Sequence, residues 1–376
     1  MTQPIPFVIH HDPAAIDDLR ARLRNTRWPD DGFGWEWGTD VGYLRELVEF
    51  WADGYDFAAR EARLATTPRY RVELDGLGIH AIHVPAARGN GIPLLLCHGW
   101  PDGTWRYEKV IDLLTNPDEG PAFDVVIPDM PGFGYSDKPR DVLDSRDVAA
   151  LWVRLMAAFG YERFTVAGGD IGSHVSRDLG LEHPERLIAI HRMDAGIPRH
   201  PDPSQLTGDE LALIQEAQAW IVSEGVYAQL HRTKPQTLAV GLSDSPAGLA
   251  SWLVEKLRAW SDCGGDLESV YTKSEILDLL STYWFTNTID SSIRMYRTNG
   301  AIDPEYLVRH IDVPSGFSVF AGEIIKPPRA WLDRVADVVS HREIDRGGHF
   351  APYEVPELYA AEVRDFFARF DEHTEG

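Results

Sequence analysis

An aspartate stands at the tip of a glycine-rich turn that follows an apolar strand. Asp170 ends the run FTVAGGD, which begins at Phe164. A backbone that reverses sharply between a strand and a helix needs small residues two positions before and after its tip, and Gly168 and Gly172 meet that need. A carboxylate held there can attack an sp3 carbon and form an ester that water then hydrolyses, whereas a serine would take an acyl group. The turn therefore indicates an epoxide or alkyl halide as substrate; the alternative is that Asp170 only caps the helix that follows.

A second motif precedes this turn and supplies backbone donors. The run HGWP from His98 to Pro101 follows an apolar strand directly. Pro101 has no N–H group, so a donor aimed at a developing negative charge must come from Trp100. The second donor is expected to be the N–H of Ile171, immediately after the nucleophile. In isolation HGWP is an ordinary strand-ending turn, but its position ahead of Asp170 favours an oxyanion hole built from Trp100 and Ile171.

A histidine and an acid complete the expected catalytic set. His349, in the run GGHF, lies after a late apolar strand and before the last helix, where a hydrolytic base is needed. Glu323 ends the preceding strand and is the expected orienting acid, in preference to Asp345, which is too close to His349 in sequence. Nucleophile, acid and base then follow the chain order of α/β-hydrolases.

The composition excludes several classes of partner. The chain has 376 residues, 44% of them hydrophobic, 12 tryptophans and a formal net charge of −23. Such a charge disfavours nucleic acid and anionic membranes. Cys97 and Cys263 form no disulfide framework or metal-ligand spacing, so we expect neither a metal nor a cofactor. The amino terminus resembles no signal peptide and no segment is long and apolar enough to be a membrane anchor, so a soluble, cytoplasmic protein is expected. A homodimer is compatible with these features.

Secondary-structure patterns predict one α/β domain interrupted by helices. Apolar strands alternate with loops and helices up to about residue 197, which indicates a mostly parallel sheet covered on both faces. From there to about residue 300 the spacing is helical, and the strand pattern then resumes. We therefore expect an α/β-hydrolase fold with an eight-stranded sheet, a helical lid and an amino-terminal helical extension. The expected segments are residues 1–69 (extension packing on core and lid), 70–197 (first part of the core), 198–305 (lid) and 306–376 (second part of the core).

Taken together, the motifs resemble one enzyme family. The chain is similar to epoxide hydrolases of the α/β-hydrolase superfamily, in the microsomal-type group that has an additional amino-terminal segment. The resemblance implies that an epoxide and water form a vicinal diol through a covalent aspartyl ester. It rests on these runs: WEWG (35–38), FW (50–51), YD (55–56), HGWP (98–101), PDMPGFGYS (128–136), GGD (168–170) and GGHF (347–350).

The same resemblance implies two proton donors and a substrate pocket. The family opens the epoxide ring with two lid tyrosines, and Tyr227 and Tyr296 match their sequence patterns. A phenol suits this role because its pKa near 10 keeps it protonated at neutral pH. Many relatives have a tryptophan where this chain has Ile171, and anchored relatives have a membrane helix that this sequence lacks. The expected pocket residues are Trp100, Ile171, Tyr283, Trp284 and Phe350.

Two functions other than epoxide hydrolysis are compatible with parts of the sequence. A haloalkane or haloacid dehalogenase would use the same Asp170 but needs halide donors, for which Trp100 and Trp284 are candidates. A non-catalytic binding protein on a hydrolase fold would be expected to lack one of the three catalytic residues, and all three are present here. A serine esterase is disfavoured because no Gly-x-Ser-x-Gly run occurs. The abundance of tryptophan in the expected lid favours a bulky or aromatic small-molecule substrate.

Overall fold

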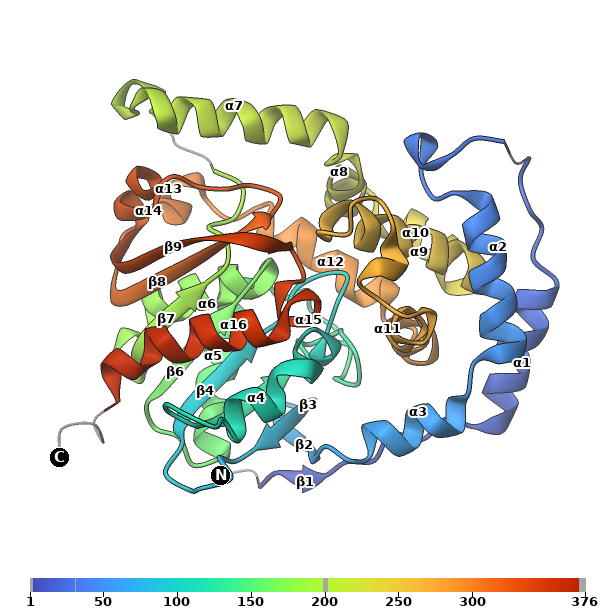
Figure 1. The fold of residues 1–376 in the computed structure, drawn as a ribbon, viewed down its shortest axis with the longest axis horizontal. Helices are drawn as coiled ribbons and strands as arrows, with labels where there is room; N and C mark the ends of the chain where they lie inside the picture. Colours follow the sequence, from blue (N-terminus) through green and yellow to red (C-terminus); the bar gives the residue numbers. More distant parts are fainter. Residues whose placement is uncertain (1–2, 31, 199–201, 372–376) are drawn as a thin grey trace.

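A computed structural model describes residues 3–30, 32–198 and 202–371, and its centre is a twisted sheet (Figure 1). The six strands from β5 to β9 in the sheet order are parallel, and the three at the other edge are antiparallel. The α/β-hydrolase architecture expected from the sequence is confirmed. The strands, in their order across the sheet, are β1 (Ile5–Pro6), β2 (Arg69–Leu74), β3 (Leu77–Val84), β5 (Phe123–Pro128), β4 (Ile92–Cys97), β6 (Phe164–Gly168), β7 (Leu187–Arg192), β8 (Ile311–Gly322) and β9 (Ala336–Gly348).

The sheet has nine strands among the described residues, where the sequence led us to expect eight. The additional strand is β1, whose Ile5 pairs with Arg71 of β2. Both residues of β1 are exposed, and a two-residue strand has no alternation of apolar and polar side chains that could reveal it. Asp75 and Gly76, both with positive φ, form the tight turn that joins β2 to β3 as a hairpin.

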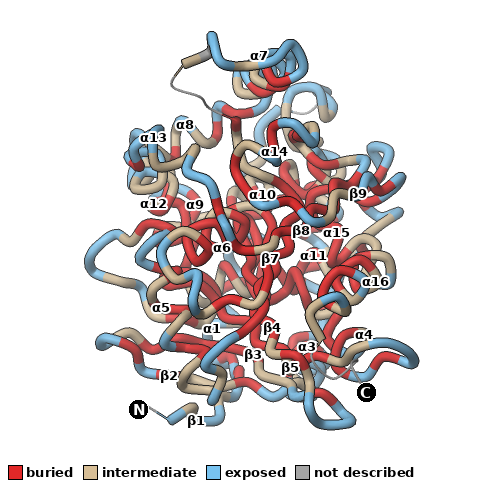
Figure 2. The backbone as a smooth tube through the Cα atoms, turned by 90° about the vertical axis from the view of Figure 1, so that its left-hand side faces the viewer, coloured by how far each residue is buried: buried red, intermediate tan, exposed pale blue. Residues whose placement is uncertain are grey.

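Helices cover both faces of the sheet, which leaves its interior buried (Figure 2). Helices α5 and α6 contribute to the apolar cluster on one face, and α4 and α16 contribute to the cluster on the other. The helices of this part are α4 (Ile111–Thr115), α5 (Ser145–Ala158), α6 (Ile171–Glu182), α14 (Arg329–Val335), α15 (Ala351–Glu354) and α16 (Pro356–Phe367).

The segment between β7 and β8 is helical, as its sequence pattern predicts. We call α7 to α12 the helical insertion; Figure 1 shows it on one side of the sheet, with α7 at its outer end. The expected start of this segment at residue 198 adjoins residues 199–201, which lie outside the described residues. Its helices are α7 (Gly208–Ser223), α8 (Val226–Thr233), α9 (Pro235–Asp244), α10 (Pro246–Trp260), α11 (Lys273–Thr286) and α12 (Ile289–Asn299), and the short α13 (Pro304–Leu307) follows them.

The amino-terminal helices flank the helical insertion. Asp12 accepts a hydrogen bond from the Ala14 N–H at 2.9 Å and α1 starts at Pro13, as the sequence predicts. Its buried face includes Leu19 and Leu23, and both α1 and α2 contact α10. Within the described residues, no helix combines the length and apolarity needed to cross a bilayer. These helices are α1 (Pro13–Arg24), α2 (Val41–Glu49) and α3 (Phe57–Leu64).

Candidate active site

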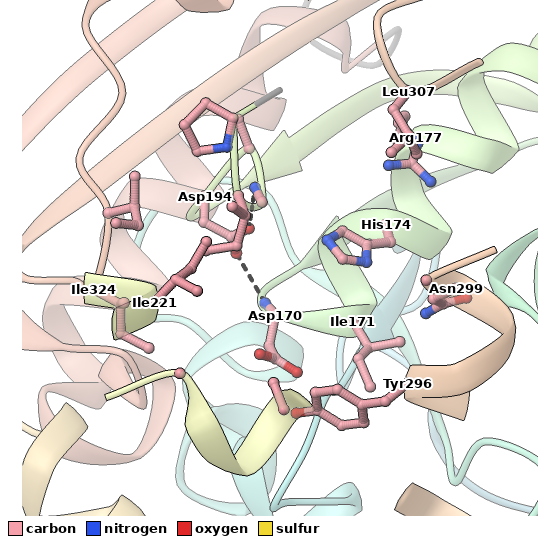
Figure 3. A pocket seen from close by; sticks show the side chains of 18 of the residues that line it. Asp170, Ile171, His174, Arg177, Asp194, Ile221, Tyr296, Asn299, Leu307 and Ile324 are labelled. Carbon is pink, nitrogen blue, oxygen red and sulfur yellow. Dashed lines mark hydrogen bonds between the residues drawn. The ribbon is translucent and has the colours of Figure 1, made fainter. Parts of the chain in front are cut away.

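Asp170 lies between β6 and α6, at the carboxyl edge of the parallel strands (Figure 3). Its φ of 58° falls in the left-handed region, which is uncommon for residues other than glycine. A Cβ atom at Gly168 would lie 2.4 Å from the Gly172 carbonyl oxygen. A Cβ atom at Gly172 would lie 2.0 Å from the Cys97 carbonyl oxygen. The turn therefore requires glycine at both positions, because any larger residue would displace the backbone.

The two carboxylate oxygens of Asp170 have different surroundings. The backbone N–H of Trp100 donates a hydrogen bond to Oδ1 at 2.9 Å. The backbone N–H of Ile171 also hydrogen-bonds this carboxylate. Oδ2 instead lies 3.4 Å from Nε2 of His349. The structure thus brings the two expected backbone donors and the expected base to one carboxylate, with Oδ2 facing the histidine.

His349 and Glu323 meet because two neighbouring parallel strands end together. Gly322 of β8 is paired in register with Gly348 of β9, and each functional side chain is on the next residue. Nδ1 of His349 lies 2.8 Å from Oε1 of Glu323, and both side chains are buried. Asp345, the competing acid, is exposed on β9. The geometry orients the imidazole so that its second nitrogen faces the Asp170 carboxylate.

Electrostatics favour a charged pair at the centre of the site. Burial acts to raise the pKa of Asp170, but the hydrogen bond and charge of His349, with the N–H groups of Trp100 and Ile171, lower it overall. Burial acts to lower the pKa of His349, but Glu323 and Asp170 outweigh burial and raise it. At neutral pH the resting site therefore contains a carboxylate next to an imidazolium.

A buried polar network connects the loops of the site. Arg106 hydrogen-bonds both the Asp102 carboxylate and the carbonyl oxygen of His349. Asp102 in turn accepts the N–H of Gly99 at 2.7 Å, so the HGWP run and the histidine loop share one guanidinium. Glu354 accepts the N–H groups of the residues on either side of His349, at 2.9 and 2.8 Å. These bonds hold the base in place.

Two tyrosines of the helical insertion face the nucleophile. Tyr227 is in the first turn of α8 and Tyr296 is on α12; their ring centroids are 5.9 Å apart and their hydroxyls interact. Burial raises the pKa of each phenol, and the Asp170 charge raises it further. Both phenols therefore stay protonated at neutral pH. Trp100 stacks on Tyr227 with 5.5 Å between centroids and supports it from behind.

These groups open onto a cavity of about 180 Å³. Since a water-sized position needs roughly 10–15 Å³, the cavity has room for about a dozen non-hydrogen atoms. In Figure 3, Ile221 and Ile324 lie to one side of Asp170, and His174 and Arg177 lie to the other. The cavity is thus apolar toward one end and basic toward the other.

The lining differs from the expected pocket. It includes Ile171 but not Trp100, Tyr283, Trp284 or Phe350. The Trp100 side chain is covered by the tyrosines, and Phe350 is completely buried. The expectation that these four side chains form the cavity wall is therefore corrected.

The two α11 residues point away from the cavity for separate reasons. The Tyr283 hydroxyl donates to the Asp102 carbonyl oxygen at 3.2 Å, beneath the site. Trp284 lies under the amino-terminal helix α1, where the Arg22 guanidinium is 5.8 Å from its ring centroid. Consecutive residues of a helix face different directions, and the sequence alone did not show which direction led to substrate.

Three cavity residues were missed by sequence reasoning. Asp194 accepts the backbone N–H of Asp170 at 2.8 Å and that of Gly196 at 2.8 Å, drawn as dashed lines in Figure 3. Arg192 and Asp194 were detectable as charged residues at the end of a buried strand, a position that points to the catalytic edge. His174 was detectable by its spacing, because four residues after Asp170 places it on the same helix face.

Comparison with known proteins identifies the family. Residues 4–107 match the model described as epoxide hydrolase N terminus, and residues 92–261 match the alpha/beta hydrolase fold. The chain is 38% identical to a Stigmatella aurantiaca protein whose name assigns it provisionally to the epoxide hydrolases, over 96% of this chain and 84% of that protein. It is 31% identical to the juvenile hormone epoxide hydrolase of Manduca sexta, over 95% of this chain and 84% of that protein.

A solved structure shows the same relationship. The juvenile hormone epoxide hydrolase of the silkworm Bombyx mori superposes with a TM-score of 0.90 at 28% identity, covering 100% of this chain and 96% of that chain. These matches do not favour the dehalogenase or the non-catalytic binding protein. The chain belongs to the epoxide hydrolase family of the α/β-hydrolase fold.

Proposed function

We propose that Asp170 opens the epoxide ring and forms a covalent ester. The observation that supports this most directly is the difference between its two oxygens, since Oδ1 is held by the Trp100 N–H at 2.9 Å. Oδ2 is then the atom that bonds to a ring carbon while the carbon–oxygen bond of the ring breaks. Oδ1 becomes the ester carbonyl oxygen, already next to the N–H groups of Trp100 and Ile171.

Tyr227 and Tyr296 supply the proton for this step. The ring oxygen becomes an alkoxide as its bond to carbon breaks, and a hydrogen bond from a phenol followed by proton transfer stabilises it. Their raised pKa values, caused by burial and by the Asp170 charge, ensure that both phenols begin protonated. After alkylation that charge is gone, because the carboxylate has become a neutral ester.

His349 then hydrolyses the ester, oriented by Glu323 through the 2.8 Å contact. Neutral imidazole takes one proton from water, and the water oxygen bonds to the Asp170 carbonyl carbon. The tetrahedral intermediate collapses, the bond to the diol oxygen breaks, and the imidazolium protonates that oxygen. The second water proton restores the phenol, so epoxide and water give one vicinal diol. The Trp100 and Ile171 N–H groups stabilise the intermediate.

Alkylation itself converts His349 into a competent base. In the resting enzyme Glu323 and Asp170 both raise its pKa, which keeps it protonated. Ester formation removes the Asp170 contribution, so the pKa falls and the imidazolium releases its proton to solvent before it activates water. His349 takes a proton back from solvent when the Asp170 carboxylate forms again. Loss of the Asp170 charge during alkylation therefore prepares His349 for ester hydrolysis.

The helical insertion acts as the lid in this proposal, because it supplies both tyrosines. The segment boundaries 1–69, 70–197, 198–305 and 306–376 assign the extension, the first core part, the lid and the second core part. Trp220 and Trp331 line the cavity, which supports a bulky substrate. A cytoplasmic location and a homodimer stay predictions from the sequence.

Isotope labelling tests the covalent mechanism. Excess enzyme should convert styrene oxide in ¹⁸O-labelled water to diol that contains no label after one turnover, because the added oxygen comes from Asp170. The peptide that contains Asp170 should then carry the label, as mass spectrometry can show. Label in the first-turnover diol would refute the ester and indicate direct attack by water. Freshly purified Asp170→Asn should lose turnover by several orders of magnitude.

A further inference from the structure

A buried arginine in the cavity wall makes no direct ion pair with the described residues. Arg192, the last residue of β7, is 1% exposed and lines the cavity, and its Nε has no hydrogen-bond partner. None of its side-chain nitrogens lies within 4 Å of a carboxylate of the described residues; the nearest aromatic contact is the Phe317 ring at 5.3 Å. Asp194, two residues on, uses both oxygens for the N–H groups of Asp170 and Gly196. The charges of Asp194 and Asp178 therefore stabilise the Arg192 guanidinium without a direct contact. A charge in this position is costly unless something neutralises it.

Other cationic groups lie at the same end of the cavity. Arg177 on α6 also lines the cavity and is buried, with one nitrogen lacking a partner. Its Nε donates to Asp178 at 2.8 Å, which neutralises one charge of the group. Arg232 at the end of α8 lines the cavity too, and its Nε is unpartnered. Three guanidinium groups thus line one cavity, and within the described residues only Arg177 forms a direct ion pair, with Asp178.

His174 also lines the cavity and is subject to the charges of all three guanidinium groups. Burial is the main reason that its pKa falls to about 3, and the charges of Arg177, Arg192 and Arg232 lower it further. Burial also lowers the pKa of Arg192 to about 10, so the guanidinium stays charged at neutral pH. His174 is therefore a neutral imidazole that can donate a hydrogen bond within a cationic pocket.

The distance from the nucleophile fixes the kind of ligand. Arg177 is seven residues after Asp170 along α6, a rise of about 10 Å. That rise corresponds to roughly six to eight carbon–carbon bonds of about 1.5 Å. Leu307 and Ile311 also line the cavity and suit an aliphatic spacer. An anionic group at the arginines can therefore belong to the molecule whose epoxide contacts Asp170.

We propose that the substrate is an epoxide of an aliphatic carboxylic acid, whose carboxylate is bound by Arg177 and Arg192. This inference rests on the proposed function, because it assigns the far end of the molecule that Asp170 attacks. A guanidinium binds a carboxylate through two parallel N–H donors, which gives the ligand a defined orientation. The position of the epoxide along the chain then decides which substrates reach the nucleophile.

Matched substrates test the proposal. Wild type should hydrolyse the ω-epoxide of nonanoic acid at least about tenfold better in kcat/KM than its methyl ester. The ω-epoxide of butanoic acid should show no preference for the acid, because its chain cannot span the distance. Charge-assisted hydrogen bonds contribute roughly ten- to hundredfold, so Arg192→Met and Arg177→Met should each reduce the acid-to-ester ratio by about that factor.

The comparison includes a matched control and a second measurement. Arg309→Met removes an exposed guanidinium paired with Glu182, outside the cavity lining, and should keep the acid-to-ester ratio. Removing the buried, unpaired Arg192 charge should raise the melting temperature, whereas loss of a purely structural arginine would lower it. If Arg192→Met fails to fold, Arg192→Lys and Arg177→Met provide the comparison, because lysine keeps the charge without the two-pronged contact.

The outcomes separate this inference from the proposed function. An equal rate for acid and ester in wild type, or an unchanged ratio in Arg192→Met, would overturn the carboxylate site while diol formation still supports the mechanism. If no epoxide gives a diol, the proposed function fails. Titration calorimetry with nonanoate then tests the carboxylate site. The site is supported if wild type binds nonanoate but not nonanamide and if Arg192→Met does not bind nonanoate. Any other result overturns the site.

Discussion

Replacing His349 with glutamine should stop the reaction at the covalent intermediate. Glutamine keeps a polar side chain of similar length but cannot take a proton from water. Loss of a general base lowers a rate by about 10²–10⁴-fold, equivalent to roughly 3–5 kcal/mol in the barrier of ester hydrolysis. Since the N–H groups that stabilise the tetrahedral intermediate remain, some residual hydrolysis should persist.

Alkylation should suffer much less from the same change. His349 lies 3.4 Å from Oδ2, so its loss removes one favourable contact and raises the pKa of Asp170. The Trp100 and Ile171 N–H groups still favour the carboxylate, which should stay ionised at pH 8. We therefore expect alkylation to slow by less than about tenfold, and the alkyl-enzyme to become the dominant species.

Intact-mass spectrometry gives the decisive measurement. His349→Gln incubated with styrene oxide should gain the mass of one substrate molecule within minutes, and digestion should place the adduct on Asp170. The double variant Asp170→Asn/His349→Gln serves as control and should gain no mass. If the single variant consumes substrate without an adduct, or gains an adduct at another residue, the two-step mechanism is wrong.

Three further changes test the proton donors, the electrostatics and the turn. Either Tyr227→Phe or Tyr296→Phe should leave partial activity, whereas the double variant should slow pre-steady-state alkylation by about 10²–10⁴-fold; an unchanged rate would mean that another donor acts. As pH falls, kcat should decline before kcat/KM. Hydrolysis needs neutral His349, and the Glu323 charge still acts to raise its pKa after the Asp170 charge is lost, whereas alkylation needs ionised Asp170, whose pKa is lowered. Coincident limbs in the two pH profiles would contradict this order. Gly172→Ala should lower the free energy of unfolding, measured by urea titration, by about 3 kcal/mol or more, because its Cβ would lie 2.0 Å from the Cys97 carbonyl oxygen. The control Gly208→Ala has open space around the new Cβ and should change the free energy of unfolding by less than about 1 kcal/mol.

The positions of Asp170, Glu323 and His349 could be predicted because each follows a strand directly. Parallel strands place their carboxyl ends at one edge, so the residues that follow them converge even when they are far apart in sequence. Glycines also mark the turns reliably, since close backbone approach excludes side chains. The catalytic edge was therefore readable from strand patterns and turn chemistry alone.

The cavity wall could not be predicted in the same way. Tyr283 and Trp284 are aromatic residues of a helix that packs on both the core and the amino-terminal helices, and aromatic character does not distinguish a pocket wall from a buried contact. The two-residue strand β1 was missed because its pairing depends on β2 and not on its own pattern. Tertiary packing decides both which aromatic side chains line the cavity and whether β1 pairs with β2.

Helix α6 links the chemistry of this site to the choice of substrate. Its amino-terminal end holds Asp170, its first turn places His174 in the cavity, and its second turn adds Arg177. This helix thus sets the separation between the backbone positions of Asp170 and Arg177, and Arg192 reaches the same cavity from the end of β7. The tyrosines lie on the helical insertion instead, so their distance to the nucleophile depends on how that insertion packs on the core. Under the two proposals, selection by substrate length and assistance to ring opening therefore depend on separate parts of the fold, and mutations should alter one without altering the other.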